Sequence, residues 1–490
     1  MGALPFHGFS SYCARLTRPS SLLRQSAFPS HLLRYSHSSS MTPPPASSSH
    51  PPWLASILRD TSPAPRIYSW TPPGSSPPRQ DHGDLARRIY ILGVGNMGRL
   101  YASSLAKLPH PPPITLVLHR RELLTEWHAS SGGIEITRQG VTESDKASFD
   151  VEYWAETPPP ASEGGSVQEI LDGGDRKIGN LIIGTKASLA IPEVDRLRRY
   201  LDPQSTVAFA QNGMNKLWPP HGQVYVSHRY PVDGETGAGS APSFVHCITG
   251  HGLTSLGSFR SRHAALADAK VGLVLPGGQD ASGYLMEQIA TAPHLNSRIV
   301  SRADLWVLQL EKLVFNTVIN PITAVLRVKN GALFENPDGP VADIMDHLLC
   351  QTSAVYLALI NHPSTADIIL SDGGEGSDGG SPSSALEAAR KRLAERFSFT
   401  TLRSILWEFG VRVGENNSSM FQDVMVGKPT EIRDLNGWIV DMARFLESSS
   451  SETTSKGLDV SAHETLIDLV EQGKVLDQEQ LAEAILPKES

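Results

Sequence analysis

The sequence predicts an α/β protein with an N-terminal Rossmann-type doubly wound domain and a mostly α-helical C-terminal domain. Residues 88–118 run through a short apolar stretch, a glycine cluster, a helical stretch and a second apolar stretch. This strand–turn–helix–strand order is the first half of a doubly wound sheet. From about Ser297 onward, apolar residues recur at helical spacing. We therefore expect a tail and linker over residues 1–86, a first domain over 87–297 and a second over 298–490.

The bulk composition narrows the class of protein. A chain of 490 residues exceeds one compact core and suggests two or three domains. The net charge is -8 and no basic stripe with interleaved aromatic residues is present, so nucleic acid is not an expected partner. The three cysteines form no CxxC pair, so neither a disulfide framework nor a metal site is expected. No apolar run reaches the roughly 18 residues that cross a bilayer, so we expect no membrane span and a monomer or homodimer.

The N-terminal segment differs from the rest of the chain. Residues 1–59 contain five arginines, no lysine, many serines and no acidic residue. This composition is typical of an organellar transit peptide and predicts import into the mitochondrial matrix. The alternatives are a disordered tail, or translation from Met41, which would leave the protein in the cytoplasm. The Pro- and Ser-rich residues 53–82 are interpreted as a linker.

Within the first domain, the pattern predicts further strands near residues 132–137, 180–186 and 206–211, with a crossover helix over 191–201. Short strands with Gly-rich turns are expected from Val224 to Gly257. Three segments resemble insertions that cannot bury much apolar surface and are predicted to be mobile surface loops. They are residues 157–177, 371–385 and 447–456.

The glycine cluster Gly93-Val94-Gly95-Asn96-Met97-Gly98 is the first candidate site. In a GxGxxG turn the first glycine permits a tight turn, the second lets backbone approach a pyrophosphate and the third allows close helix–strand packing. Free N–H groups at the helix start then hold the anion. Alone the motif is weak, but here it follows an apolar strand and opens a helix. Dinucleotide binding by Gly93, Gly95, Asn96, Met97 and Gly98 is the prediction.

The end of the second strand indicates which dinucleotide binds. NAD sites usually carry an acidic residue there, whereas NADP sites place arginine nearby. This chain has His119-Arg120-Arg121 with no acid before Glu122. Because guanidinium groups suit a phosphate, we predict NADP (NADPH), with Arg120 and then Arg121 as ligands. The alternative is that both arginines are solvated surface charge.

A polar stripe in an apolar helix is the second candidate site. Lys312, Asn316 and Asn320 are spaced by four and lie on one helical face. Burying unpaired polar groups costs several kcal/mol, so the stripe needs partners. Composition alone leaves a helix-packing network and a functional site equally open.

Taken in order, the motifs resemble the ketopantoate reductase (2-dehydropantoate 2-reductase) family. The resemblance covers roughly residues 87–475. It consists of the glycine cluster and the following segments: Thr185-Lys186-Ala187, Gln211-Asn212-Gly213, Lys312 to Ala324, Asn330-Gly331, Ser418-Ser419-Met420, Asp423, Thr430-Glu431-Ile432 and Asn436-Gly437. The sequence departs from the family's pattern in its three insertions, its N-terminal extension and the absence of proline before His463.

The resemblance implies roles for individual residues. Lys312 would be the general acid and Glu431 the second catalytic residue, also touching the cofactor. Asn316, Asn320, Ser419 and Asn212 would contact the substrate. Lys186 and Asn212 would lie on the cofactor side of the site. No metal is implied.

The family's reaction gives the first hypothesis for function: NADPH-dependent reduction of 2-dehydropantoate (ketopantoate) to pantoate, for pantothenate and coenzyme A synthesis. The first alternative keeps the chemistry but changes the substrate to another small 2-keto acid. The second is a non-catalytic organellar protein on the same fold, since a fold alone does not determine function.

Overall fold

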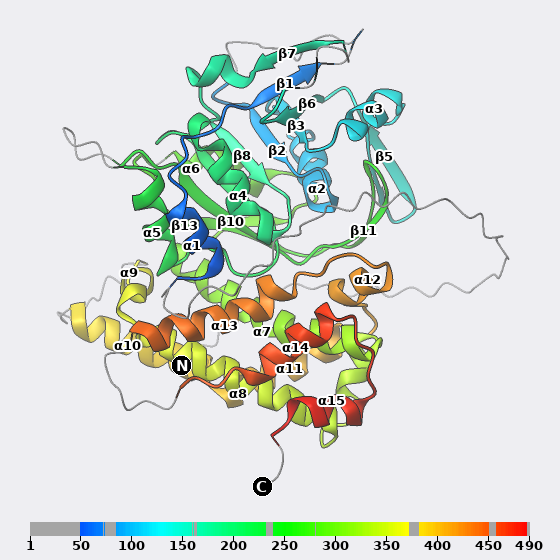
Figure 1. Ribbon diagram of the computed structural model, residues 1–490. Helices are drawn as coiled ribbons and strands as arrows, with labels where there is room; N and C mark the ends of the chain where they lie inside the picture. Colours follow the sequence, from blue (N-terminus) through cyan, green and yellow to red (C-terminus); the bar gives the residue numbers. More distant parts are fainter. Residues whose placement is uncertain are drawn as a thin grey trace, which may run out of the picture. The chain divides into compact units, whose positions relative to one another are not determined.

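A ten-stranded mixed sheet organises the first half of the chain (Figure 1). Its order is β14-β13-β10-β9-β8-β2-β3-β6-β1-β7. Strand β2 is buried along its whole length and pairs in parallel with β3 on one side and β8 on the other. The strand order therefore reverses beside β2, which is where doubly wound folds bind ligands. The strands are β1 (Tyr68–Thr71), β2 (Ile89–Leu92), β3 (Ile114–Leu118), β6 (Phe149–Ala155), β7 (Ser166–Glu169), β8 (Asn180–Ile183), β9 (Thr206–Phe209), β10 (Ser243–Thr249), β13 (Ala269–Leu275) and β14 (Ser297–Ile299).

A second, four-stranded sheet has the order β11-β12-β4-β5. Helix α2 contacts three of its strands as well as β2, so the helix that follows the glycine cluster lies between the two sheets. Trp127 packs on Phe259 with ring centroids 5.1 Å apart and closes the space between the sheets. The elements are β4 (Ile134–Arg138), β5 (Val141–Asp145), β11 (Gly252–Gly257) and β12 (Arg260–Ala265), with helices α2 (Asn96–Leu105), α3 (Arg121–Ala129), α4 (Ala187–Leu197), α5 (His221–Arg229) and α6 (Ser282–Thr291).

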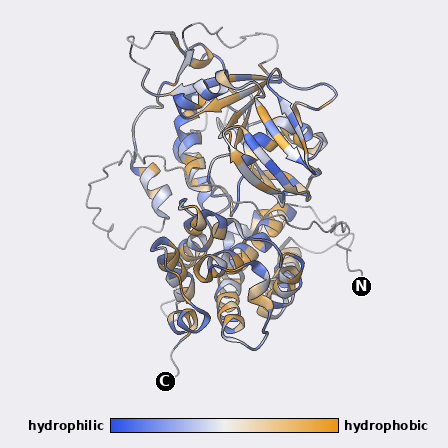
Figure 2. Ribbon diagram, turned by 90° about the vertical axis from the view of Figure 1, so that its right-hand side faces the viewer, coloured by the Kyte–Doolittle hydropathy of each residue, from blue (hydrophilic) through white to orange (hydrophobic). Residues whose placement is uncertain are grey.

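The second half is helical, which confirms the predicted fold class. Hydrophobic and hydrophilic residues alternate around its helices, as expected where each helix buries one face (Figure 2). The long helices α7 and α8 contribute many fully buried side chains. The helices are α7 (Arg302–Leu326), α8 (Pro340–Asn361), α9 (Ala366–Ile369), α10 (Pro382–Arg396), α11 (Phe399–Arg412), α12 (Ser419–Met425), α13 (Ile432–Ser449), α14 (Ser461–Glu471) and α15 (Gln478–Ile485).

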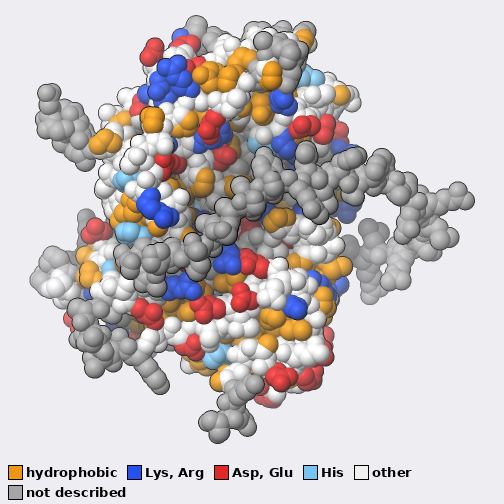
Figure 3. Space-filling model, in the orientation of Figure 1, with side chains coloured by type: hydrophobic (Ala, Val, Ile, Leu, Met, Phe, Trp, Pro, Cys, Tyr) orange, Lys and Arg blue, Asp and Glu red, His pale blue; other side chains and the backbone are white. Residues whose placement is uncertain are grey.

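The computed structural model describes residues 50–71, 73, 85–158, 160, 164–231, 239–279, 281–371, 382–449 and 457–487. Most of the predicted transit segment, and the greater part of the loops expected at 371–385 and 447–456, lie outside these residues. Among the helices described, none is long and apolar enough to cross a membrane. Where described residues form the surface in Figure 3, cationic and anionic side chains are interspersed.

The expected linker is wrong for two segments. Helix α1 (Pro52–Arg59) buries Leu54, and strand β1 pairs antiparallel with both β6 and β7. Proline at the first helical position starts a helix because its missing N–H would have had no partner there. Composition counted Pro52 as a linker residue and overlooked this positional meaning. Arg229 holds the arm to the sheet domain by pairing with Asp60 and Asp195, each at 2.8 Å.

Two further expectations need correction. Residues 166–169 form the edge strand β7, and a 3-10 turn over Ile170–Gly174 buries Ile170, so the segment 157–177 is not a mobile loop throughout. Its partner is β1, a strand from far away in the sequence. Short strands were expected from Val224, but α5 continues to Arg229 and places Tyr225 in the core.

We predict that Tyr200→Phe lowers the free energy of unfolding by about 1–3 kcal/mol, because a buried N–H loses its partner. The Tyr200 hydroxyl accepts from the Ile67 N–H at 2.8 Å and donates to Glu169 at 3.0 Å, joining the N-terminal arm to β7. Urea unfolding measures the change. Tyr68→Phe, which removes a hydroxyl from a half-buried ring in β1, is the control and should change stability by less than about 0.5 kcal/mol. Equal effects in the two variants would contradict the role of Tyr200.

Candidate active site

The glycine turn has the geometry of a backbone cradle. Gly93 adopts φ of 94°, and a Cβ there would lie 2.7 Å from the Gly184 carbonyl carbon. A Cβ on Gly98 would lie 2.2 Å from the Gly93 oxygen, so both positions exclude larger residues. A Cβ on Gly95 would meet nothing within 4 Å, which leaves open space at the N-terminus of α2. Asn96 and Met97 are the first residues of α2, and no side chain caps it. The residues therefore fit a pyrophosphate.

Arg99 ties this turn to the second sheet. Its buried guanidinium donates to the Val94 and Gly257 carbonyl oxygens at 3.0 Å and also to the Arg260 carbonyl. It further donates to Ser261 Oγ at 3.1 Å, and that hydroxyl donates to Asn96 Oδ1 at 2.8 Å. Sequence reasoning missed this role. The available signal was a cation inside the apolar stretch Leu100–Leu105, since a buried charge needs partners.

The two candidate phosphate ligands lie in different surroundings. Arg120 is exposed just before α3, at the end of β3. The Arg121 guanidinium lies over the Trp70 ring, 5.7 Å from its centroid, so strand β1 of the N-terminal arm positions it. Their role as ligands of a 2′-phosphate stays a prediction.

Lys312 points from the middle of α7 to the ends of two strands. Its ammonium donates to the Thr249 carbonyl oxygen at 2.6 Å and to Asn212 Oδ1 at 3.1 Å. Burial lowers the pKa of Lys312 to about 8, although the charge of Glu431 acts in the opposite direction. An ammonium has three N–H donors, and these two bonds leave one for another acceptor.

Asn212 connects Lys312 to Glu431. Its Nδ2 donates to Glu431 Oε2 at 3.3 Å, while its Oδ1 accepts from Lys312. Burial raises the pKa of Glu431, against the opposing effects of the Asn212 hydrogen bond and the charge of Lys186. Lys186 forms an ion pair with Asp423 at 3.5 Å and also donates to the Pro429 carbonyl. Residues of both halves of the chain therefore meet at one site.

The other predicted substrate contacts are placed unequally. Asn316 lines the same small cavity as Lys312. Asn320 is only 8% exposed and does not line that cavity. Ser419 is exposed at the start of α12, whereas its neighbour Ser418 is buried, caps α12 and hydrogen-bonds to Thr323 at 2.7 Å. The substrate-binding roles of these residues stay predictions.

Part of the motif set has a structural purpose. Pro321 has no N–H, so the Thr317 carbonyl four residues earlier loses its helical partner. Asn436 of α13 donates to that carbonyl at 2.9 Å and lies 3.0 Å from His463 Nδ1. Asn436 thus repairs the helix that carries Lys312.

Two buried residues that sequence reasoning did not single out also line the Lys312 cavity. His246 lies 3.4 Å from the Asn215 side chain, and burial, with the nearby charge of Lys312, lowers its pKa to about 3. His246 is therefore neutral near pH 7, which leaves Lys312 as the cationic acid there. Gln309, one helical turn before Lys312, donates to the Gly213 carbonyl at 3.0 Å. The sequence signal was the turn spacing of Gln309 and Lys312.

Two family models match the chain. "Ketopantoate reductase PanE/ApbA" matches residues 89–275, and "Ketopantoate reductase PanE/ApbA C terminal" matches residues 304–474. The chain belongs to the ketopantoate reductase family. This confirms the resemblance drawn from the motifs, and the family's oxidoreductase class applies to the chain.

Two relatives in this family resemble the chain over most of its length. A protein named ketoisovalerate reductase BEA2, from Gibberella fujikuroi, is 43% identical over 90% of this chain and 100% of its own. A ketoisovalerate reductase from Beauveria bassiana is 40% identical over 89% of this chain and 99% of its own. Among solved structures, a D-mandelate dehydrogenase complex with NADH and anilino(oxo)acetate covers 80% of this chain and 99% of its own, with 13% identity and a TM-score of 0.50. At that identity the likeness concerns the fold alone.

We predict that Lys312 titrates near pH 8 and that Glu431→Gln lowers its pKa further, because the variant removes a charge that favours the ammonium. NMR of 13C-methylated lysines, with the signal assigned through Lys312→Arg, measures both values. Glu415→Gln is the control, since Glu415 pairs with Lys329 at the surface. A wild-type value above pH 10, or a shift equal to that of the control, would contradict the coupling.

Proposed function

We propose that this member of the ketopantoate reductase family reduces a small branched 2-keto acid, 2-ketoisovalerate, with NADPH. The observation that carries the proposal is the Lys312 ammonium, held by Asn212 and Thr249 with one N–H free and with a pKa lowered to about 8. The substrate class is supported by two relatives of 40% and 43% identity that are named ketoisovalerate reductases.

The reaction needs a hydride at the carbonyl carbon and a proton at the carbonyl oxygen. When bound, NADPH supplies the hydride. As the carbon is reduced, its oxygen becomes an alkoxide, and the free N–H of Lys312 can stabilise this charge and donate the proton. Glu431 offsets the charge of the ammonium through Asn212, which keeps Lys312 protonated near pH 7 despite its burial.

The cofactor's residues follow from the glycine turn. Gly93, Gly95 and Gly98 would receive the pyrophosphate at the start of α2, while Arg99 holds that turn against the second sheet. Arg120 and Arg121 would bind the 2′-phosphate that distinguishes NADPH from NADH. The support for NADPH is this pair of cations and the lack of an acid at the end of β3.

Ketopantoate is the second candidate substrate. The family description favours it, and it was the first expectation from the motifs. It differs from 2-ketoisovalerate by one hydroxymethyl group, so it needs one more polar partner. The two relatives span nearly the whole chain and support the smaller acid more strongly. A non-catalytic role would leave the cost of burying Lys312 beside Asn212 without a purpose.

We predict a kcat/KM for 2-ketoisovalerate at least about tenfold above that for ketopantoate, since a buried hydroxyl without a partner costs 1–3 kcal/mol. Following NADPH absorbance with each acid in turn gives both values. A preference for ketopantoate would overturn the substrate while leaving the reductase chemistry in place. Absence of turnover with every 2-keto acid tested would overturn the proposal itself.

Lys312→Ala should lower kcat about 10²–10⁴-fold, the usual contribution of a positioned acid. Wild-type kcat should fall as the pH rises through about 8, because the ammonium that donates the proton is then lost. Steady-state rates from pH 6 to 10 measure both effects. Lys329→Ala, at an exposed lysine, is the control and should keep the wild-type profile. Full activity in Lys312→Ala would remove Lys312 from the mechanism.

Arg120→Ala should raise the KM for NADPH about 10–100-fold, the range expected for a charge-assisted bond, and change the KM for NADH little. Cofactor titrations at saturating keto acid measure this. Arg412→Ala removes another exposed arginine and should leave both values unchanged. Equal losses with NADPH and NADH would show that Arg120 does not recognise the phosphate.

A further inference from the structure

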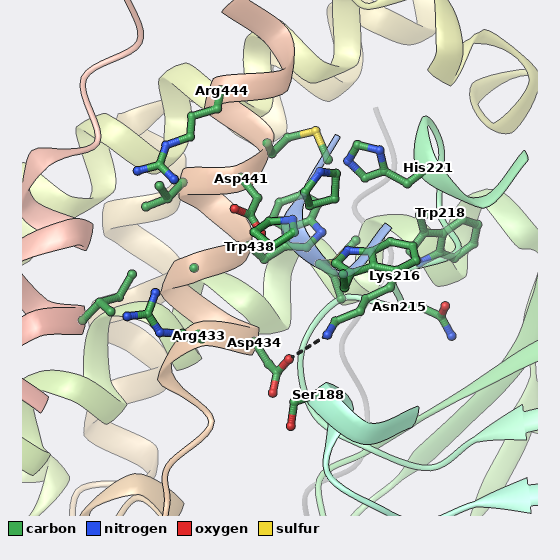
Figure 4. A pocket seen from close by; sticks show the side chains of 18 of the residues that line it. Ser188, Asn215, Lys216, Trp218, His221, Arg433, Asp434, Trp438, Asp441 and Arg444 are labelled. Carbon is green, nitrogen blue, oxygen red and sulfur yellow. Dashed lines mark ion pairs between the residues drawn. The ribbon is translucent and has the colours of Figure 1, made fainter. Parts of the chain in front are cut away.

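A cavity of about 580 Å³ lies where α1, the segment 214–221, α13 and α14 meet (Figure 4). This volume is in the range of small-molecule sites. None of Lys312, Asn212, Glu431 and Lys186 lines it. The cavity is thus separate from the candidate active site, and the family's reaction gives it no role.

The cations that line this cavity already have partners. Lys216 pairs with Asp434 at 3.2 Å, the dashed line in Figure 4. Arg444 pairs with Glu464 at 2.7 Å, and Arg433 forms two bonds with Glu471 at 2.5 and 2.6 Å. His221 contributes no charge near pH 7, since burial, together with the charge of His50, lowers its pKa to about 4. An anionic ligand would therefore have to break an existing ion pair.

One carboxylate at the wall of the cavity is in the opposite position. Asp434, Trp438 and Asp441 recur at intervals of four and three residues along α13, so they share one helical face. Among the described residues, none lies within ion-pair distance of Asp441. Burial raises its pKa to about 6, despite the more distant charges of Arg444, Lys216 and Arg433. A cation placed beside Asp441 would relieve this cost without displacing a partner.

Aromatic rings flank that carboxylate. Figure 4 shows Trp438 and Asp441 side by side on α13 at the wall of the cavity. Trp438 packs against Tyr356 on one side, at 6.4 Å between ring centroids, and remains partly exposed. Trp53 of α1 also lines the cavity. Tryptophan faces attract cations and also accept the apolar part of a ligand.

We infer that this cavity is a binding site for an organic cation, a small amine with an aromatic or apolar body, whose ammonium pairs with Asp441 while its body packs on Trp438. The carboxylate selects the charge and the tryptophans select the apolar body. Helix α1 belongs to the N-terminal arm that precedes the family's matched region, so this chain completes the wall with a segment of its own.

The test compares three ligands of the same shape by isothermal titration calorimetry at pH 7.5 with the full chain. They are 2-phenylethylamine, 2-phenylethanol and phenylacetate, which are cationic, neutral and anionic. We expect the amine to bind at least about tenfold more tightly than the alcohol, and phenylacetate not to bind. Phenylacetate or the alcohol binding as tightly as the amine would overturn the inference, as would the absence of amine binding.

Two variants locate the site. Asp441→Asn should weaken binding of the amine at least about tenfold, because it removes only the charge. Asp468→Asn, at an exposed carboxylate that also lines the cavity, is the matched control and should stay within about twofold of wild type. Trp438→Leu should weaken the amine and the alcohol alike, and a thermal melt confirms that each variant is folded. Unchanged amine binding in folded Asp441→Asn would overturn the assignment.

Discussion

The side-chain amide of Asn212 holds the two halves of the candidate site together. Its oxygen accepts from Lys312 and its nitrogen donates to Glu431, so one residue at the end of β9 fixes groups on both α7 and the segment before α13. An ammonium taken out of water must be compensated by fixed acceptors. The Thr249 carbonyl at the end of β10 is the second such acceptor. The ends of two neighbouring parallel strands therefore determine where the helical half can place its lysine.

The distribution of charge around this amide also separates the possible acids. Lys312 remains a cation near neutral pH because Glu431 lies behind Asn212, whereas His246 in the same cavity is held neutral by burial. The two groups share a cavity but differ in their neighbours. A site with one poised donor suits a reaction that needs one proton at one oxygen.

Sequence reasoning succeeded where the signal was local and failed where partners were distant. The glycine turn was predictable because strand, turn and helix are contiguous. The four-residue spacing from Lys312 to Asn320 suggested one face, but four residues exceed a helical turn by about 40°. The stripe therefore rotates away from the site, and Asn320 is buried outside the cavity. Arg99 and strand β1 could not be assigned, because their partners lie more than 75 residues away in the chain.

The bond from Asn436 to the Thr317 carbonyl has a consequence for how this sequence can change over time. Pro321 creates an acceptor that only a side chain can satisfy, and Asn436 is the donor. Replacing the proline restores the helical bond and leaves the amide in surplus, while replacing the asparagine leaves the carbonyl unpaired. Each single step passes through a less stable intermediate, so drift at one position is held back by the other. The helix that carries Lys312 is thereby locked to α13 in its history as well as in its packing.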